Sequence, residues 1–149
     1  MVSRVIPVDP FDLVIFGATG DLARRKILPG LFHRYAVGQM PEEARIVGTA
    51  RTPMEQEAFR ILVRDSLMEF APGPTKQVNL LDRFLDKISY LCIDAMGDLG
   101  WADLAGCLRE SATRAFYLSV SPSLFGTLAA KLSAYGIATP QSRIVVEKP

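Results

Sequence analysis

The feature that most constrains the fold is an apolar run that ends at two closely spaced glycines. The run covers 13–16 and stops at Gly17, and Gly20 follows before a row of three cations at 24–26. Glycine adopts backbone angles that are closed to other residues, so a strand that ends this way turns sharply into the next element. Apolar residues at helical spacing then continue to Tyr35. The segment therefore predicts a strand, a tight turn and a helix.

Four further short apolar runs follow, and longer helical stretches separate them. Short continuous apolar runs suit parallel strands that are covered on both faces. Strands that alternate with helices form parallel sheets joined by right-handed crossovers. The sequence therefore predicts an α/β fold, a Rossmann-like doubly wound parallel sheet. The expected strands are 13–16, 45–48, 88–93, 115–120 and 143–147.

The helices expected between these strands have recognisable boundaries. Pro29 interrupts the apolar pattern of the first helix and predicts a kink. Thr52 and Pro53 are typical of an N-cap and a first helical position, because Glu55 completes a capping box. The stretch between the second and third strands is long enough for two helices, an addition to the simple pattern. The ranges expected after the first helix are 52–70, 78–87, 99–109 and 121–135.

Composition argues against several classes of function. The 149 residues carry a formal net charge of +1, so no basic field points to nucleic acid. No apolar run approaches the ~18 residues of a membrane span, and the first residues lack the apolar core of a signal peptide. Cys92 and Cys107 form no CxxC pair and there is one histidine, so no metal site is expected. We expect a cytoplasmic protein with neither a membrane nor a nucleic-acid partner.

The glycine turn is expected to hold a phosphate. N–H groups at the start of a helix lack partners and carry a partial positive charge, which suits the pyrophosphate of a dinucleotide. The common G-x-G-x-x-G/A pattern appears here as Gly17-x-x-Gly20-x-x-Ala23, with its middle glycine displaced by one residue. Thr19 adds a hydroxyl donor. The cations at 24–26 fan out over about 300° of a helix, so only one or two of them can face the ligand.

The residue after the second strand is expected to select the dinucleotide. A carboxylate there binds the ribose of NAD, whereas an arginine suits the 2′-phosphate of NADP. Arg51 and Thr52 stand at this place without any acid, so NADP is predicted. Asp94 and Ala95 follow the third strand, either bordering the adenosine half of the cofactor or forming a turn or helix cap. Residues 121–122 follow the fourth strand, in line for the nicotinamide half.

On these motifs the chain resembles the glucose-6-phosphate dehydrogenases, from about Phe11 to Pro149. GATGDLARRK is similar to the glycine-rich GxxGDLA segment of that family and the cations after it, and GTAR is similar to its NADP-selecting arginine segment. FYLSVSPSLF resembles its Tyr-Leu-Ala-x-Pro-Pro segment, although Ser121 stands where the first of the two prolines is usual. RIVVEKP resembles the start of its Glu-Lys-Pro-Phe-Gly segment.

The resemblance implies NADP-dependent oxidation of glucose 6-phosphate at C1 to 6-phosphogluconolactone, in the pentose phosphate pathway. It places Lys148 between cofactor and substrate and Lys26 near the sugar. It implies that 1–149 is the dinucleotide-binding domain of a homodimeric or homotetrameric enzyme, whose large α+β domain and catalytic base lie beyond Pro149. No catalytic residue, and no activity, is therefore expected within this chain. The expected cofactor-binding residues are Gly17, Ala18, Thr19, Gly20, Asp21, Leu22, Ala23, Arg24, Arg51, Asp94, Ala95 and Lys148.

Two other interpretations stay open at this point. Extended short-chain reductases share the Gly-x-x-Gly turn, but they need a Tyr-x-x-x-Lys pair, which this sequence lacks. A stand-alone NADP-binding sensor would explain why the sequence has no catalytic base. It would not explain a chain that stops within Glu147-Lys148-Pro149, where a strand should pass into a loop. His33, the one histidine, lies 13 residues after Gly20 and thus ~20 Å along the helix, where it is expected to be a surface residue.

Overall fold

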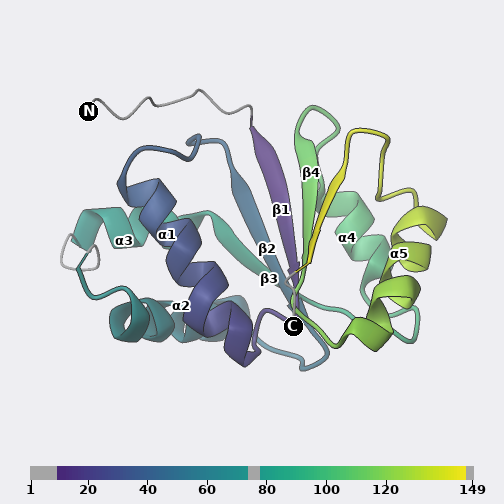
Figure 1. The fold of residues 1–149 in the computed structure, drawn as a ribbon, viewed down its shortest axis with the longest axis horizontal. Helices are drawn as coiled ribbons and strands as arrows, with labels where there is room; N and C mark the ends of the chain where they lie inside the picture. The colour runs from purple at the N-terminus through teal and green to yellow at the C-terminus, as the bar shows by residue number, and fades with distance from the viewer. Residues whose placement is uncertain (1–9, 74–77, 147–149) are drawn as a thin grey trace.

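Five parallel strands form one sheet in the order β3-β2-β1-β4-β5 (Figure 1). This computed structural model describes residues 10–73 and 78–146. From β1 the chain moves outward through β2 to β3, then returns to the other side of β1 and continues through β4 to β5. This order confirms the predicted doubly wound α/β fold. The strands are Phe11–Phe16 (β1), Arg45–Ala50 (β2), Ile88–Cys92 (β3), Thr113–Leu118 (β4) and Arg143–Val146 (β5).

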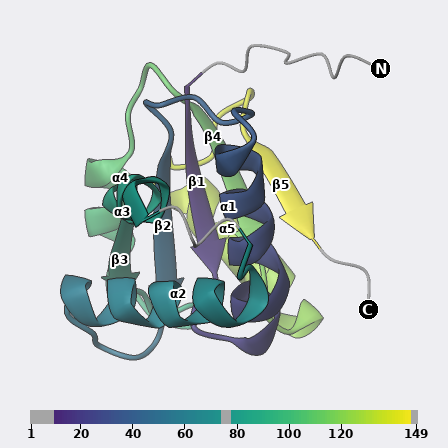
Figure 2. The same cartoon turned by 90° about the vertical axis from the view of Figure 1, so that its left-hand side faces the viewer.

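Helices cover both faces of the sheet. A π-helical segment, η1, leads into α1, and these two pack with α2 and α3 on one face, which Figure 2 shows from that side. α4 and α5 lie on the opposite face, with the short 3-10 turn η3 before α5 (Figure 1). In the part of the chain described, no helix is long and apolar enough to cross a membrane. The bounds are Ala23–Ile27 (η1), Leu28–Ala36 (α1), Gln56–Phe70 (α2), Val78–Asp86 (α3), Trp101–Cys107 (α4), Pro122–Leu124 (η3) and Phe125–Ala134 (α5).

Each central strand contributes to two hydrophobic cores. In β1, Leu13 and Ile15 belong to the core under α1, α2 and α3, because alternate residues of a strand point to one face. Val14 and Phe16 belong to the core under α4 and α5, where the ring of Phe16 stacks 5.7 Å from that of Trp101. The continuous apolar run is therefore explained by burial on both faces.

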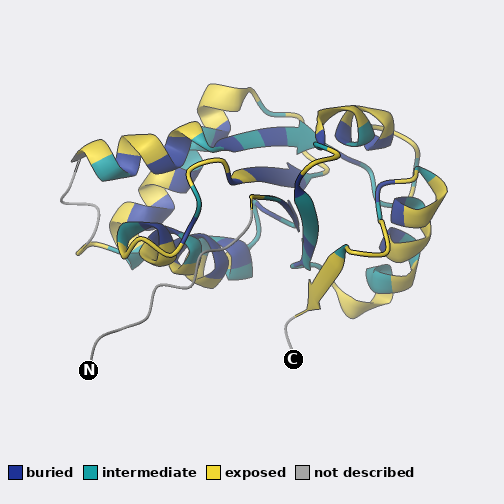
Figure 3. Cartoon of the chain, turned by 90° about the horizontal axis from the view of Figure 1, so that it is seen from above, coloured by how far each residue is buried: buried dark blue, intermediate teal, exposed yellow. Residues whose placement is uncertain are grey.

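The strand at one edge of the sheet is an exception to this double coverage. All four residues of β5 are exposed, including the apolar Ile144, Val145 and Val146 (Figure 3). β5 pairs with β4 on one side, in the register Phe116 to Ile144. The expected fifth strand is confirmed as far as Val146, and Glu147 lies outside the described residues.

The expected cap of α2 needs correction, whereas the expected disturbance at Pro29 is seen as an irregular helix. Thr52 does not cap α2, which begins at Gln56 after the extended Glu55, and no side chain caps it. Residues 51–55 instead form a connection that is fixed by contacts with β3. At Pro29 the irregularity takes the form of the π-helical η1, in which the Leu28 N–H donates to the Ala23 carbonyl. The helix continues from η1 into α1, and Pro29 has no N–H to donate to the preceding turn. The ends of α2 at Phe70 and of α5 before Gly136, at φ +66°, are as expected.

Candidate functional site

The glycine turn lies between the carboxyl ends of β2 and β4. The N–H groups of Gly17 and Ala18 both donate to the Thr49 carbonyl at 3.0 Å, and the Ser119 N–H donates to the Phe16 carbonyl at 2.8 Å. Gly17 has φ +83°, and a Cβ there would lie 2.1 Å from the Ser119 carbonyl oxygen. Only glycine fits this position for two reasons. A positive φ is unfavourable for residues with a side chain, and a Cβ would collide with the neighbouring main chain.

The helix that follows the turn presents unpaired donors. The Gly20 N–H closes the turn by donating to the Gly17 carbonyl at 3.0 Å, and the first helical hydrogen bond runs from the Arg24 N–H to the Gly20 carbonyl at 3.1 Å. The N–H groups of Asp21 and Leu22 precede this bond and have no main-chain acceptor among the described residues, so they are available to an anion. Ala18 and Ala23 are fully buried, which keeps the start of the helix close to the sheet.

These groups fit the pyrophosphate of a dinucleotide. The turn provides backbone donors at a helix start, and Gly17 lets the turn pass directly against the main chain of Ser119. The Ser119 hydroxyl oxygen, beside the turn, is buried and has no hydrogen-bond partner among the described residues. Ser119 was not among the residues predicted from the sequence, because its register against Gly17 becomes visible only when β4 is paired with β1.

The three cations after the turn do point in different directions. The Arg24 Nε lies 3.4 Å from the Ser66 hydroxyl of α2. Arg25 pairs with the Asp21 carboxylate at 2.7 Å and lies over the Phe70 ring. Lys26 is exposed and is not in any of the ion pairs of the described residues. The Asp21 side chain is thus engaged by Arg25, which leaves the backbone N–H as the group that Asp21 offers to a ligand.

Arg51 and Asp94 both lie at the carboxyl end of the sheet, where ligands of open parallel sheets bind. Arg51 directly follows β2, is exposed, and has no ion-pair partner in the described part of the chain. The Asp94 carboxylate accepts the Met96 N–H at 3.0 Å, and its carbonyl accepts the Trp101 indole N–H at 3.0 Å. These bonds show that Asp94 shapes the turn before α4. Ala95 packs against the adjoining core.

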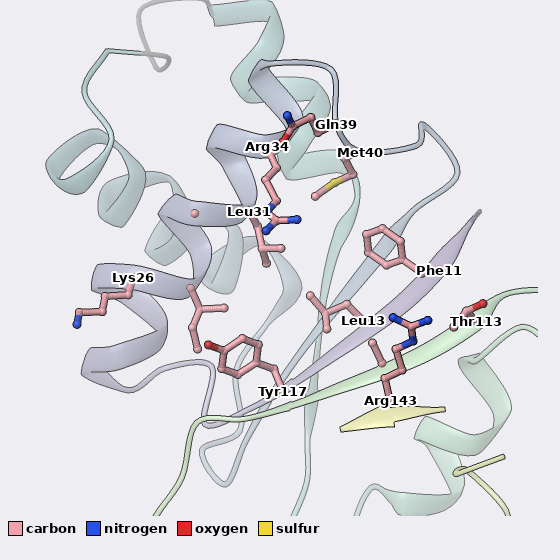
Figure 4. Close-up of a pocket in the computed structure, with 13 residues that line it drawn as sticks. Phe11, Leu13, Lys26, Leu31, Arg34, Gln39, Met40, Thr113, Tyr117 and Arg143 are labelled. Atoms are coloured by element: carbon pink, nitrogen blue, oxygen red, sulfur yellow. The ribbon is translucent and has the colours of Figure 1, made fainter. Parts of the chain in front are cut away.

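The chain also has a groove of about 580 Å³ between α1 and the strands β1, β4 and β5 (Figure 4). Apolar side chains contribute to its lining, among them Leu13 and Leu31, and Tyr117 lines it from β4. Lys26 lies at its rim, with its amine pointing away from the other lining residues (Figure 4). The groove is not lined by the glycine turn or by Arg51, so the predicted cofactor site and this groove are separate features of the surface.

Two other predicted positions have different outcomes. His33 is exposed on α1, as expected for a surface histidine. Lys148 lies outside the described residues, so its predicted place between cofactor and substrate stays a prediction. Among the described residues no group of three metal-ligating side chains occurs.

Sequence reasoning missed the side chains that hold the Arg51 segment. The Tyr90 hydroxyl shares its one proton between the carbonyls of Ala50 and Thr52, and Gln56 bonds to the Tyr90 main chain. Tyr90 appeared in the sequence only as an apolar strand residue. A partner 38 to 40 positions away leaves no local pattern that would have revealed this contact.

Comparison with known proteins gives one consistent result. Residues 14–149 match the family described as "Glucose-6-phosphate dehydrogenase, NAD binding domain". The glucose-6-phosphate 1-dehydrogenase of Rhizobium meliloti (strain 1021) is 41% identical over 151 residues, which cover 100% of this chain and 31% of the relative. That of Leuconostoc mesenteroides is 35% identical over 158 residues, which cover 100% of this chain and 31% of the relative.

Solved structures agree with the sequence relatives. A glucose-6-phosphate dehydrogenase in complex with its substrate glucose 6-phosphate superposes with a TM-score of 0.80 at 28% identity, over 97% of this chain and 32% of that one. The enzyme from Mycobacterium avium superposes with a TM-score of 0.83 at 28% identity, over 95% of this chain and 30% of that one. The chain thus spans about a third of the length of the relatives it matches.

Proposed function

Because the chain belongs to the glucose-6-phosphate dehydrogenase family, we propose that it is the NADP-binding part of an enzyme that oxidises glucose 6-phosphate at C1 to 6-phosphogluconolactone. The observation that carries the proposal is the pre-formed turn at Gly17, which offers unpaired helix N–H groups at the carboxyl end of the sheet. NADP, when bound, supplies the nicotinamide ring that accepts a hydride. This chain's residues bind and orient it.

The pyrophosphate is proposed to lie on the glycine turn. The N–H groups of Asp21 and Leu22 would donate to it, with the Thr19 hydroxyl beside them. Ala18, Leu22 and Ala23 hold the turn and the helix start against the sheet, since both alanines are buried and Leu22 packs on the core. The Arg24 Nε lies near the Ser66 hydroxyl, and the Nη groups of Arg24 would donate to a phosphate.

The choice of NADP over NAD is proposed to rest on Arg51. Its guanidinium is exposed at the end of β2 and has no ion-pair partner within the described residues, so it can bind a 2′-phosphate through charge-assisted hydrogen bonds. Asp94 and Ala95 border the same edge and are proposed to flank the adenosine. No acid lies in the segment 49–52 that would favour the ribose of NAD.

Substrate oxidation is proposed to require more protein than these 149 residues. Lys26 and Lys148 would contact glucose 6-phosphate, and a base would take the proton of the C1 hydroxyl. The one histidine, His33, is exposed on α1 and far from the turn. We propose that the base and the larger α+β domain belong to the remaining two thirds of the relatives' length, in a cytoplasmic homodimer or homotetramer.

A titration of the 149-residue chain with NADPH and NADH tests the proposal. Arg51→Ala should weaken NADPH binding by about 10-fold to 100-fold, because a hydrogen bond to a charged group contributes about 1.5–3 kcal/mol. NADH binding should not change. Arg45→Ala is the matched control, since Arg45 is an exposed arginine at the opposite end of the same strand.

Three results would contradict parts of the proposal. Binding of neither dinucleotide at millimolar concentration would overturn the cofactor site. An unchanged ratio of NADPH to NADH affinity in Arg51→Ala would remove the role of Arg51. Turnover of glucose 6-phosphate by the chain alone would refute the proposal that the base lies elsewhere.

A further inference from the structure

The main chain that carries Arg51 is held by side chains of β3. The Tyr90 hydroxyl shares its one proton between the Ala50 carbonyl, at 3.2 Å, and the Thr52 carbonyl. The Cys92 thiol donates to the Arg51 carbonyl itself, with 3.1 Å between sulfur and oxygen. Three successive carbonyls, one on each side of Arg51 and its own, are thus bound from one neighbouring strand.

Strand register explains why these two side chains act together. Tyr90 and Cys92 are two residues apart on β3, so they point to the same face of the sheet. Ala50 pairs with Cys92 in the parallel ladder, and the Ala50 carbonyl also accepts the Ile93 N–H at 2.9 Å. The chain that leaves β2 therefore passes across the end of β3. This places the carbonyls of residues 50–52 next to the Tyr90 hydroxyl and the Cys92 thiol.

The far end of the same connection is tied to Tyr90 as well. β3 is an edge strand, so its outer backbone groups lack a neighbouring strand. The Gln56 amide nitrogen donates to the Tyr90 carbonyl at 2.6 Å, and the Gln56 amide oxygen accepts the Tyr90 N–H at 2.8 Å. One amide thus substitutes for the missing strand and fixes the first residue of α2 against β3.

Tyr90 is itself firmly placed. Its side chain is buried and its ring packs 4.9 Å from that of Phe59. Burial, with a smaller contribution from Cys92, raises the pKa of Tyr90 above its ordinary value of 10.0. The hydroxyl therefore keeps its proton at neutral pH and remains a donor.

We infer that Tyr90, with Cys92 and Gln56, is a positioning residue for dinucleotide selection. These three residues, the Tyr90 clamp, fix the backbone at Arg51 while leaving its guanidinium exposed. A long, flexible side chain binds a phosphate more tightly when its backbone is already in place, because less freedom is lost on binding. The inference rests on the proposed function, in which Arg51 binds the 2′-phosphate of NADP.

Tyr90→Phe is the direct test, because it removes the hydroxyl and keeps the buried ring. In titrations of the 149-residue chain, NADPH binding should weaken by about 3-fold to 10-fold, as for the loss of about one hydrogen bond. NADH binding should change less than about 2-fold, because the pyrophosphate turn is untouched. Tyr35→Phe is the matched control, since the Tyr35 hydroxyl bonds to Glu42 at the other end of the sheet.

The double variant Arg51→Ala/Tyr90→Phe shows whether Tyr90 acts through Arg51. If it does, Tyr90→Phe should have no further effect on NADPH binding once Arg51 is gone. Equal weakening of NADPH and NADH, or the same loss with and without Arg51, would overturn the inference and leave Tyr90 a purely structural residue.

The same set of proteins separates the two claims. If Arg51→Ala abolishes the preference for NADPH but Tyr90→Phe leaves it intact, the inference fails and the proposed function stands. If Arg51→Ala leaves the preference intact, or if the chain binds neither dinucleotide, the assignment of Arg51 fails and the inference fails with it.

Discussion

Two arginines at opposite ends of the sheet, Arg109 at the amino end and Arg51 at the carboxyl end, are used in opposite ways. At the amino end, Asp12 is buried and accepts three hydrogen bonds from Arg109, of which the shortest is 2.6 Å. Arg109 also donates to the carbonyls of Phe11 and Glu43, and so joins the loop before β4 to the starts of β1 and β2. The Asp12–Arg109 pair therefore holds the fold together at the amino end.

At the carboxyl end the main chain is fixed, and the Arg51 guanidinium takes part in none of the ion pairs of the described residues, although Asp21 pairs with Arg25 there. The glycine turn is bound through backbone groups to Thr49 and Phe16. The segment at Arg51 is bound through its carbonyls to Tyr90 and Cys92, and the guanidinium stays exposed. The comparison shows how a segment can be held firmly and still offer a charged side chain to a ligand. The contacts that fix the segment are made to its backbone, so the side chain stays accessible. Substitutions at the two ends should separate stability from binding.

The largest effect is expected for Gly17→Ala. A Cβ at Gly17 would lie 2.1 Å from the Ser119 carbonyl oxygen, and the residue would remain at φ +83°. The positive φ costs about 1 kcal/mol and the forced movement of the strand about 3 kcal/mol, so we expect a loss of about 4 kcal/mol in urea unfolding. Gly38→Ala is the control, because Gly38 has φ +77° but open space around it. Similar losses in both variants would show that the contact with Ser119 is unimportant.

Asp12→Asn should have the next largest effect, at the amino end. It leaves Arg109 without its buried carboxylate, and the loss of one partner of a buried pair typically costs about 3 kcal/mol. Asp21→Asn, in the exposed pair with Arg25 near the glycine turn, should cost less than about 0.5 kcal/mol. Urea unfolding measures both. If Asp12→Asn changed the ratio of NADPH to NADH affinity, the separation of the two ends would be wrong.

Much of this comparison could be predicted from the sequence where the signal is local. The strand–turn–helix at Gly17, the five strands and the place of Arg51 all follow from short patterns of apolar residues and glycines. Thr52 shows the limit, since a good capping box was overridden when the Thr52 carbonyl was bound by Tyr90 and α2 began at Gln56. Contacts between β3 and the end of β2, like the pairing of Asp12 with Arg109 across 97 positions, depend on strand order and have no local signature.

Alkaline pH should lower the unfolding free energy through two buried tyrosines, Tyr35 near the amino end of the sheet and Tyr90 near the carboxyl end. Burial raises the pKa of Tyr90, and burial together with Glu42 raises the pKa of Tyr35. A raised folded pKa contributes stability that is fully present below the ordinary value of 10.0 and is lost as pH rises through the folded value. The unfolding free energy should therefore fall as the pH rises above about 10, and less steeply in Tyr35→Phe/Tyr90→Phe. Equal slopes for the two proteins would contradict this account.

Cys92→Ala should produce the smallest effect and is the finest test of how the carboxyl end is built. A thiol is a weak donor, so losing its bond to the Arg51 carbonyl should weaken NADPH binding by about 2-fold and leave NADH binding unchanged. Cys107→Ala is the control, because the Cys107 thiol bonds to Leu104 within α4, away from Arg51. A Cys92→Ala effect as large as that of Tyr90→Phe would mean that the hydroxyl is not the main support of Arg51. If Cys92→Ala left NADPH binding unchanged, the support of Arg51 would come from Tyr90 and Gln56 alone. The backbone would then be held on either side of Arg51, and not through the Arg51 carbonyl.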